Sequence, residues 1–221
     1  MAGHIAIVAD GAFPKHPHPL KVLRNADKII CCDNAVLKLE RHCGLHCDFI
    51  AGDMDSMSPE NQIKYKDIIC KESEQEHNDM TKAFRLAMTL KPEKISILGA
   101  TGLREDHTLG NISLVAEYAR IFRNVEMITD YGIFFPLLDS SAIKCRKGEQ
   151  ISIFAFDQTL RIKSAGLKYP TDNVVFDLWW KATLNEALEE DVHLEFNHPA
   201  RVIVFRNYQI KSPRPGTGAA G

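Results

Sequence analysis

The stretch ISILGATGLREDHTLGNISLVAEYA, residues 95–119, decides the fold that we expect. It opens at 95–98 with a short run that is apolar on both faces, as is typical of a buried strand in a parallel sheet. After a glycine-bearing turn, apolar residues recur at the spacing of one helix face: Ile112, Val115, Ala116 and Ala119. A strand that turns directly into a helix is the repeating unit of an α/β protein.

Similar apolar runs and helical periods lie on both sides of this unit. Three more buried strands are predicted at 5–8, 28–32 and 125–128. A second helix face has the spacing i, i+3, i+4, i+7, i+8: Met80, Ala83, Phe84, Ala87 and Met88. Because strands that alternate with helices need crossover connections, we expect an N-terminal three-layer α/β domain with a mostly parallel sheet.

The pattern changes after about residue 131. Short strand candidates then follow one another, with turn residues and no long helical period between them, at 134–138, 150–156, 160–162, 174–178, 192–196 and 201–205. This succession predicts a C-terminal all-β sandwich domain. We therefore expect an α/β domain at 1–131, a β-sandwich domain at 132–211 and a disordered tail rich in proline and glycine at 212–221.

Composition and charge exclude several classes of protein. The 221 residues include 27 Lys plus Arg and 29 Asp plus Glu, a net charge of −2, so bulk charge favours neither nucleic acid nor an anionic membrane as a partner. No apolar run approaches the roughly 20 residues that span a bilayer. The N-terminus lacks the pattern of a secretory signal, and the six cysteines are scattered. We expect a cytoplasmic protein with reduced thiols.

The strongest local signal is the run Gly52-Asp53-Met54-Asp55-Ser56, which follows a short apolar segment at 49–51. Two carboxylates one residue apart at the end of a strand can converge on one point, and a divalent cation would remove their repulsion. Mg²⁺ in particular is usually held by one or two carboxylates, with waters and substrate phosphates. An acidic turn in which Asp55 or Ser56 caps a helix explains the same residues equally well.

A second acidic site, at 75–79, comes immediately before the predicted helix at 80–88. Asn78 or Asp79 suits the N-cap position, and helix capping alone explains the choice of residue there. Lys82 lies one turn further on, within reach of Asp79 or of a phosphate.

The glycine-bearing turn at 99–111 is the third candidate element. Such a turn puts free backbone N–H groups at a helix N-terminus, a natural phosphate site, and Arg104 adds a bidentate donor. The turn is neither a Walker loop nor a complete G-x-G-x-x-G fingerprint. The acids at 53, 55 and 79 support a ligand site at this turn, since ligands of open α/β sheets bind at the carboxyl ends of the strands.

Other candidate sites have less support. The pairs His42-Cys43 and His46-Cys47 suggest zinc, but no second ligand pair follows at a regular interval, so we treat them as ordinary helix or loop residues. Cys31 and Cys32 are expected to be packed thiols in a strand. The pair at 179–180, two tryptophans, is expected in a β segment, and residues 16–19 are expected to form an extended loop.

Taken together, the three candidate segments resemble the thiamine pyrophosphokinase family. That family carries Gly-Asp-x-Asp-Ser, then Thr/Asn-Asp-x-x-Lys-Ala at a helix start, then a Gly-rich turn into Arg-x-Asp-His-x-x-x-Asn. These motifs stand here at 52–56, 78–83 and 104–111. Further likenesses continue the match in order up to about residue 210, at 10–14, 33–35, 165–170 and 182–186.

The resemblance implies a fold, a reaction and a set of site residues. The family has an α/β domain followed by a β-sandwich, works as a homodimer with thiamine near the subunit interface, and transfers a pyrophosphoryl group from ATP to the hydroxyl of thiamine, releasing AMP. The implied Mg²⁺ ligands, which with Arg104 are also the catalytic residues, are Asp53, Asp55 and Asp79. The implied ATP-binding residues are Asp33, Ser56, Lys82, Gly102, Arg104, Asp106, His107 and Asn111. The implied thiamine-binding residues are Gln75, Tyr169, Thr183 and Asn185.

Three positions depart from the family pattern. Tyr169 stands in place of a Trp, Leu184 in place of a Ser and Leu103 in place of a Gly. The departures keep open another small alcohol as the acceptor, or an inactive nucleotide-binding regulator. A structural module whose acids only cap helices is a further alternative. The proton acceptor for the attacking hydroxyl, Asp79 or Asp55, also stays open.

Overall fold

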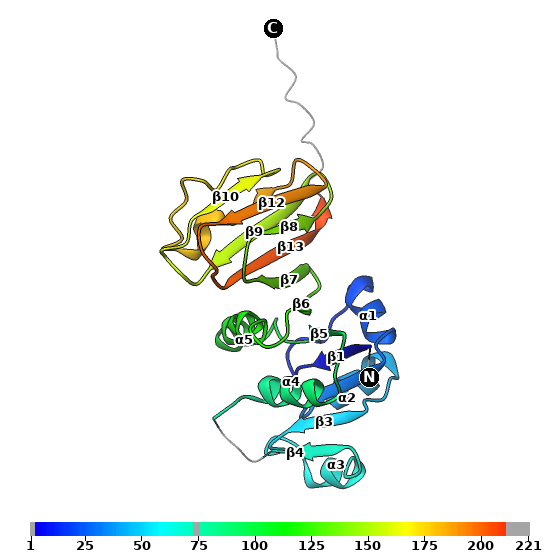
Figure 1. Cartoon of the computed structure of the whole chain (residues 1–221). Coiled ribbons are helices and arrows are strands. Elements are labelled where there is room, and N and C mark those ends of the chain that lie inside the picture. The colour runs from blue at the N-terminus through cyan, green and yellow to red at the C-terminus, as the bar shows by residue number, and fades with distance from the viewer. Residues whose placement is uncertain (1–2, 73–75, 211–221) are drawn as a thin grey trace. The chain divides into compact units, whose positions relative to one another are not determined.

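The computed structural model of the chain describes residues 3–72 and 76–210. It divides into two compact units. The first holds the described residues up to Asp130 together with Phe134–Pro136, and the second holds Tyr131–Ile133 and the described residues from Leu137 onward. Figure 1 shows the helices gathered in the first unit and strands dominating the second.

The first unit is built on a parallel sheet. Its strands lie in the order β6-β5-β1-β2-β3-β4, and each neighbouring pair is parallel. The strands are β1 (His4–Val8), β2 (Lys28–Cys32), β3 (Phe49–Gly52), β4 (Ile69–Lys71), β5 (Lys94–Leu98) and β6 (Val125–Ile128). The helices are α1 (Pro17–Arg24), α2 (Ala35–Cys43), α3 (Pro59–Lys64), α4 (Asp79–Thr89) and α5 (Glu105–Tyr118).

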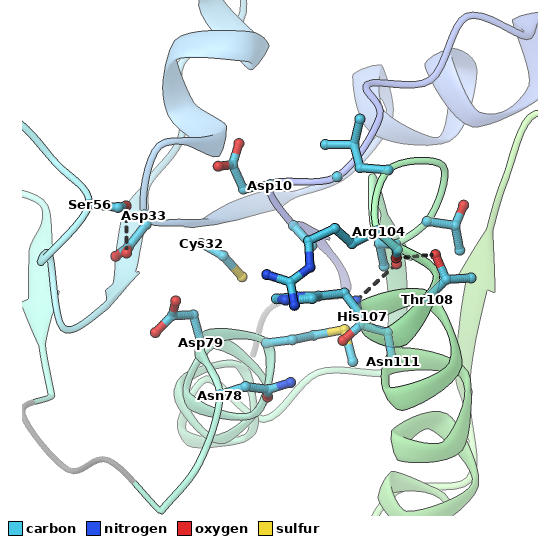
Figure 2. A pocket seen from close by; sticks show the side chains of 16 residues that line it. Asp10, Cys32, Asp33, Ser56, Asn78, Asp79, Arg104, His107, Thr108 and Asn111 are labelled. Atoms are coloured by element: carbon cyan, nitrogen blue, oxygen red, sulfur yellow. Dashed lines mark hydrogen bonds between the residues drawn. The ribbon is translucent and has the colours of Figure 1, made fainter.

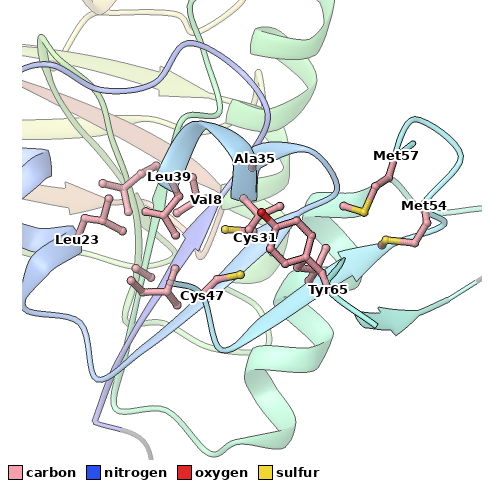
Figure 3. Packing of buried hydrophobic residues seen from close by; sticks show 14 residues of the cluster. Val8, Leu23, Cys31, Ala35, Leu39, Cys47, Met54, Met57 and Tyr65 are labelled. Atoms are coloured by element: carbon pink, nitrogen blue, oxygen red, sulfur yellow. The ribbon is translucent and has the colours of Figure 1, made fainter. Parts of the chain in front are cut away.

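The central strands are buried on both faces, which explains why they could be predicted as unbroken apolar runs. On one face, Ala6, Val8 and Cys31 pack with α1 and α2 residues such as Leu23 and Leu39 (Figure 3). Successive strand residues point to opposite faces, so the buried residues between these face the other side of the sheet. Helix α4 contacts β1, β2 and β3 and buries the predicted stripe that includes Phe84.

The second unit consists of antiparallel strands. One group has the order β11-β9-β13 and the other β10-β12-β8. The elements are β7 (Gly132–Leu137), β8 (Ser141–Lys144), β9 (Glu149–Ala155), β10 (Ile162–Ala165), the 3₁₀ helix η1 (Trp179–Ala182), β11 (Asn185–Glu186), β12 (Asp191–Phe196) and β13 (Val202–Ile210). A parallel α/β region followed by an antiparallel β region confirms the predicted fold class.

Two local predictions are wrong. Residues 17–19 form the first turn of α1 and not an extended loop, because proline is tolerated in the first turn of a helix. His16 is the N-cap, and its side chain accepts a bond from the His18 N–H. The segment 174–178 is not a strand, and the two tryptophans lie in η1. There a turn bond from Val174 to Thr171 replaces sheet pairing.

Several strand bounds also differ from those predicted. The strand predicted at 160–162 begins only at Ile162. The strands β4, β8 and β11, of two to four residues, were not predicted. The tail at 212–221 lies outside the described residues. Within the described part of the chain, none of the helices has the length and apolar character needed to cross a bilayer.

Candidate functional site

A pocket of about 380 Å³ opens at the carboxyl ends of the parallel strands in the first unit (Figure 2). Its walls come from the residues that follow β1, β2, β3 and β5 and from the first turns of α4 and α5. The lining side chains with polar groups are Asp10, Cys32, Asp33, Ser56, Asn78, Asp79, Thr101, Arg104, His107, Thr108 and Asn111. The predicted strand-end location of the site is therefore where the structure has its pocket.

Three carboxyl groups form a cluster at one side of this pocket. Asp33, Asp53 and Asp79 each bring a carboxylate oxygen to within 4.8 Å of the other two, from three separate elements. Within residues 3–72 and 76–210, no other group of three or more His, Cys, Asp or Glu side chains meets this distance, so the alternative zinc site at 42–47 gains no support. Two of the three predicted metal ligands, Asp53 and Asp79, are thus brought together, and Asp33 joins them.

Asp55, the third predicted metal ligand, lies outside the cluster and is exposed. The cause is the residue between the two acids. Met54 has a left-handed backbone, with φ of 64°, and its side chain is 1% exposed in a core that includes Met57 and Tyr65 (Figure 3). This turn brings the Asp55 N–H back to within 3.0 Å of Asp53 Oδ1. The role of Asp55 as a ligand remains a prediction.

Asp33 is fixed by the turn that carries Asp53. Its Oδ1 accepts the Met54 N–H at 3.3 Å, and its Oδ2 accepts the Ser56 hydroxyl at 3.1 Å. This approach requires glycine at position 52, where a Cβ atom would lie 2.0 Å from Asp33 Oδ1 and where φ is 153°. Asn34 donates to Ser56 and completes the arrangement.

The cluster carries an excess of negative charge. Burial, and after it the charge of Asp79, raises the pKa of Asp33 to about 6, and burial raises the pKa of Asp79. The side chain of Lys82 is 2% exposed, and its ammonium nitrogen lies 3.7 Å from Asp53 Oδ2 and 3.3 Å from Asp79 Oδ1. Three ionised carboxylates around this one ammonium leave two negative charges in excess, a charge that one divalent cation would neutralise.

The start of α4 combines both roles expected of the acidic segment at 75–79, helix capping and a place at the acidic site. Asn78 is the N-cap, and its side chain accepts the Thr81 N–H at 3.0 Å, as predicted. Asp79 is the first residue of the helix, and its carboxyl group is directed to the acidic cluster. Capping therefore explains Asn78, while the position of Asp79 is explained by the cluster.

The opposite wall of the pocket is the turn between β5 and α5, which is joined to the loop after β1. The Gly11 N–H donates to the Gly99 carbonyl at 2.7 Å, and the Ala12 N–H donates to the Thr101 carbonyl at 2.8 Å. Asn111 donates from α5 to the Ala100 carbonyl at 2.9 Å (Figure 2). These bonds hold the two loops together at the edge of the sheet.

Arg104 stands at the N-cap of α5 and lines the pocket. Its guanidinium group makes two bonds to the exposed carboxylate of Asp106, at 2.5 and 3.1 Å, and this carboxylate holds the pKa of Arg104 above its usual range. His107 also lines the pocket. Gly102 and Asp106 are not among the residues that line it, and Lys82 reaches it only through the acidic cluster.

Sequence reasoning did not select several residues of this pocket as site residues. Asp10, Cys32, Thr101 and Thr108 all line it. Asp10 and Cys32 lie at the ends of predicted strands, so their place at the carboxyl edge of the sheet was the available signal. Burial raises the pKa of the Cys32 thiol well above its usual range, as expected of a packed thiol.

The residues predicted to bind thiamine lie mainly in the second unit. Tyr169 and Asn185 are joined by two hydrogen bonds, and the Thr183 hydroxyl donates to the Trp180 carbonyl at 2.7 Å. Leu184, next to Asn185, has a left-handed backbone with φ of 56°. Gln75 lies outside the described residues.

The fold and the pocket define a class of two-domain protein, in which an α/β domain with an acidic pocket at its strand ends is followed by an antiparallel β domain. Family models agree with this division. "Thiamin pyrophosphokinase, catalytic domain" matches residues 20–128, and "Thiamin pyrophosphokinase, substrate-binding domain" matches residues 132–205. The chain belongs to the thiamin pyrophosphokinase family, which confirms the resemblance drawn from its motifs.

Individual relatives support the same family and fold. The chain is similar to the thiamine pyrophosphokinase of Bacillus subtilis, with 26% identity over 129 residues, 55% of this chain and 60% of that relative. A solved structure of that protein matches at a TM-score of 0.76 and 22% identity, covering 92% of this chain and 98% of the other. Thiamin pyrophosphokinase from Candida albicans matches at a TM-score of 0.77 and 17% identity, covering 93% and 89%.

Proposed function

We propose that this chain transfers a pyrophosphoryl group from ATP to the hydroxyl group of thiamine, giving thiamine diphosphate and AMP. The observation that carries the proposal is a pocket that the acids Asp33 and Asp79 line together with the Arg104 turn at the start of α5. Transfer of this kind depends mainly on positioning and on neutralising phosphate charge. A cation site opposite a phosphate site provides both.

Asp33, Asp53 and Asp79 are the proposed ligands of a divalent cation. Their oxygen donors and the two negative charges in excess fit Mg²⁺, which prefers carboxylates and retains waters and substrate phosphates. When bound, the ion would neutralise non-bridging phosphate oxygens. Asp55 is kept as a further candidate ligand, because it follows directly on the same turn. Lys82 holds Asp53 and Asp79 together from the buried side.

The β5–α5 turn is the proposed phosphate-binding element. The N-terminus of α5 offers oriented N–H donors, and a guanidinium fork suits phosphate oxygens. In the structure that fork is paired with Asp106, so phosphate has to compete with this carboxylate for Arg104. We assign His107 and Asn111 to the same site, and Gly102, Asp33, Ser56 and Lys82 to its support.

The acceptor hydroxyl requires a group that takes its proton. Asp79 lines the pocket and Asp55 does not, so Asp79 is the proposed acceptor. Arg104 would then stabilise the charge that develops on the departing AMP.

Thiamine is assigned to residues of the second unit; the assignment of Gln75, which lies outside the described residues, stays a prediction. Tyr169, which is exposed, offers an aromatic ring on which a flat heterocycle can stack, and Thr183, which is half-buried, offers a hydroxyl group. We also propose that the protein is a cytoplasmic homodimer. Large apolar side chains exposed in the same unit support a partner surface: Tyr169, Val175, Leu178, Trp180, Leu184 and Leu188. The mass of the protein in solution tests the dimer.

The direct test is the reaction itself. Purified protein is incubated with ATP, Mg²⁺ and thiamine, and thiamine diphosphate and AMP are detected by mass. Equal amounts of both products support the proposal. AMP release with another small alcohol but not with thiamine would change the acceptor, and tight ATP binding without turnover of any acceptor would indicate an inactive regulator.

A further inference from the structure

Asn185 is a buried amide at the start of β11, and its side chain is used within the protein. It is 3% exposed and pairs with Ile151 of β9. Its Oδ1 accepts the Tyr169 N–H at 3.1 Å and the Glu186 N–H at 2.9 Å, and its Nδ2 donates to the Tyr169 carbonyl at 2.7 Å. Two donors opposite the oxygen and one carbonyl opposite the nitrogen also fix the orientation of the amide.

The bonds from Asn185 hold the main chain of Tyr169 on both sides of its Cα atom. Tyr169 is 61% exposed, so the residue combines a fixed backbone with an exposed side chain. Neighbouring bonds continue this attachment, from the Lys168 N–H to the Glu186 carbonyl at 2.9 Å and from Leu188 to Gly166 at 2.8 Å. The segment that carries Tyr169 is thereby bound to β11 and the residues after it.

We propose that Asn185 is a positioning residue that acts on thiamine only through Tyr169 and does not touch it. The inference rests on the proposed function, and it proposes an indirect role in place of the direct contact expected from the family motif. With 3% of Asn185 exposed and both acceptor positions of its amide occupied, a ligand finds almost no surface there. An aromatic ring that is held in place before binding loses less freedom when a heterocycle stacks on it.

A double-mutant cycle on thiamine turnover tests this role. We expect Asn185→Ser to raise the KM for thiamine about tenfold, the equivalent of about one net hydrogen bond, with little change in kcat or in the KM for ATP. In a Tyr169→Ala background the same substitution should change the KM less than twofold, because the ring it positions is absent. An equal effect in both backgrounds would mean that Asn185 contacts thiamine directly, and would overturn the proposal.

Amide hydrogen exchange provides a second readout that needs no thiamine. In the wild-type chain the Tyr169 N–H should exchange slowly, although it lies beside an exposed ring, and it should exchange at least tenfold faster in Asn185→Ser. The control is Asn197→Ser, which removes a comparable bond, from the Arg161 N–H to Asn197 Oδ1 at 2.7 Å, elsewhere in the same unit. This control should leave both the Tyr169 exchange and the KM for thiamine unchanged.

The exchange measurement also separates this inference from the proposed function. A wild-type chain that does not turn over thiamine contradicts the function, while slow exchange at Tyr169 still supports the attachment by Asn185. Fast exchange at Tyr169 in the wild-type chain overturns the positioning role whatever the acceptor is. This last result requires no variant, so it holds even if Asn185→Ser does not fold.

Discussion

Replacing Asp33 with asparagine should make the metal-free protein more stable and at the same time weaken its response to Mg²⁺. The carboxyl group of Asp33 is buried beside Asp79, and its pKa is raised from 3.8 to about 6. A carboxyl group whose pKa is higher in the folded than in the unfolded state destabilises the fold once it is ionised. Asp33→Asn removes this charge and keeps the size of the side chain.

The magnitude follows from the pKa and from the two hydrogen bonds. At about 1.4 kcal/mol per pH unit, the ionised group destabilises the fold by about 3 kcal/mol at pH 7.5 and about 1 kcal/mol at pH 4.5. An asparagine oxygen still accepts the Met54 N–H, but its NH₂ group faces Ser56, which must reverse its hydroxyl at a cost of about 1 kcal/mol. The net gain is about 2 kcal/mol at pH 7.5, and it vanishes near pH 4.5.

Calorimetry with EDTA at the two pH values measures this difference. A gain of about 2 kcal/mol corresponds to a rise in Tm of roughly 4–8 °C at pH 7.5 for a chain of this size. Adding Mg²⁺ should then raise the Tm of the wild-type chain more than that of Asp33→Asn. The reasoning fails if the variant is less stable than wild type at pH 7.5 without metal, or if Mg²⁺ raises both Tm values equally.

Four further substitutions test the site and its backbone. Asp53→Ala should abolish Mg²⁺-dependent AMP release from a folded protein. An equal loss in Asp55→Ala would support the assignment of Asp55 as a ligand from the sequence. If Asp55→Ala retains more than a tenth of wild-type activity, that assignment is contradicted. Gly52→Ala puts a Cβ atom 2.0 Å from Asp33 Oδ1, so it should cost more than about 2 kcal/mol in chemical denaturation and weaken Mg²⁺ binding. Leu184→Gly relieves a left-handed backbone at an exposed residue and should stabilise the fold by about 1 kcal/mol; lower stability would show that φ of 56° carries no strain.

The elements best predicted from the sequence are those whose residue pattern depends only on burial along one continuous segment. The strands β2 and β6 were predicted at their observed bounds, because strands buried on both faces are unbroken apolar runs. β4 was not predicted, because two of its three residues are only partly buried and the third is exposed. At α1 the prediction was wrong, because Pro17 and Pro19 indicated an extended loop although the first turn of a helix tolerates proline at both positions.

The candidate site was predictable as a region but not as a set of contacts. Any residue that follows a parallel strand lies at the carboxyl edge of the sheet, which was enough to select the segments around Asp53, Asp79 and Arg104. Which side chains meet there depends on backbone conformation. Met54 takes a left-handed conformation that its residue type does not indicate, because it is held by burial of its side chain in the core.

Met54 separates Asp53 from Asp55. The register of the sheet brings Asp33 to Asp53. Cys32 pairs with Ala51, and the Asp33 N–H donates to the Ala51 carbonyl at 3.1 Å, so the residue after β2 lies directly beside the end of β3. Asp33 therefore meets Asp53 across two strands that are 17 residues or more apart in the chain, through a pairing that no local pattern encodes. Spacing in the sequence indicates how many acids reach the edge of the sheet; register and one buried methionine decide which of their carboxyl groups lie close together.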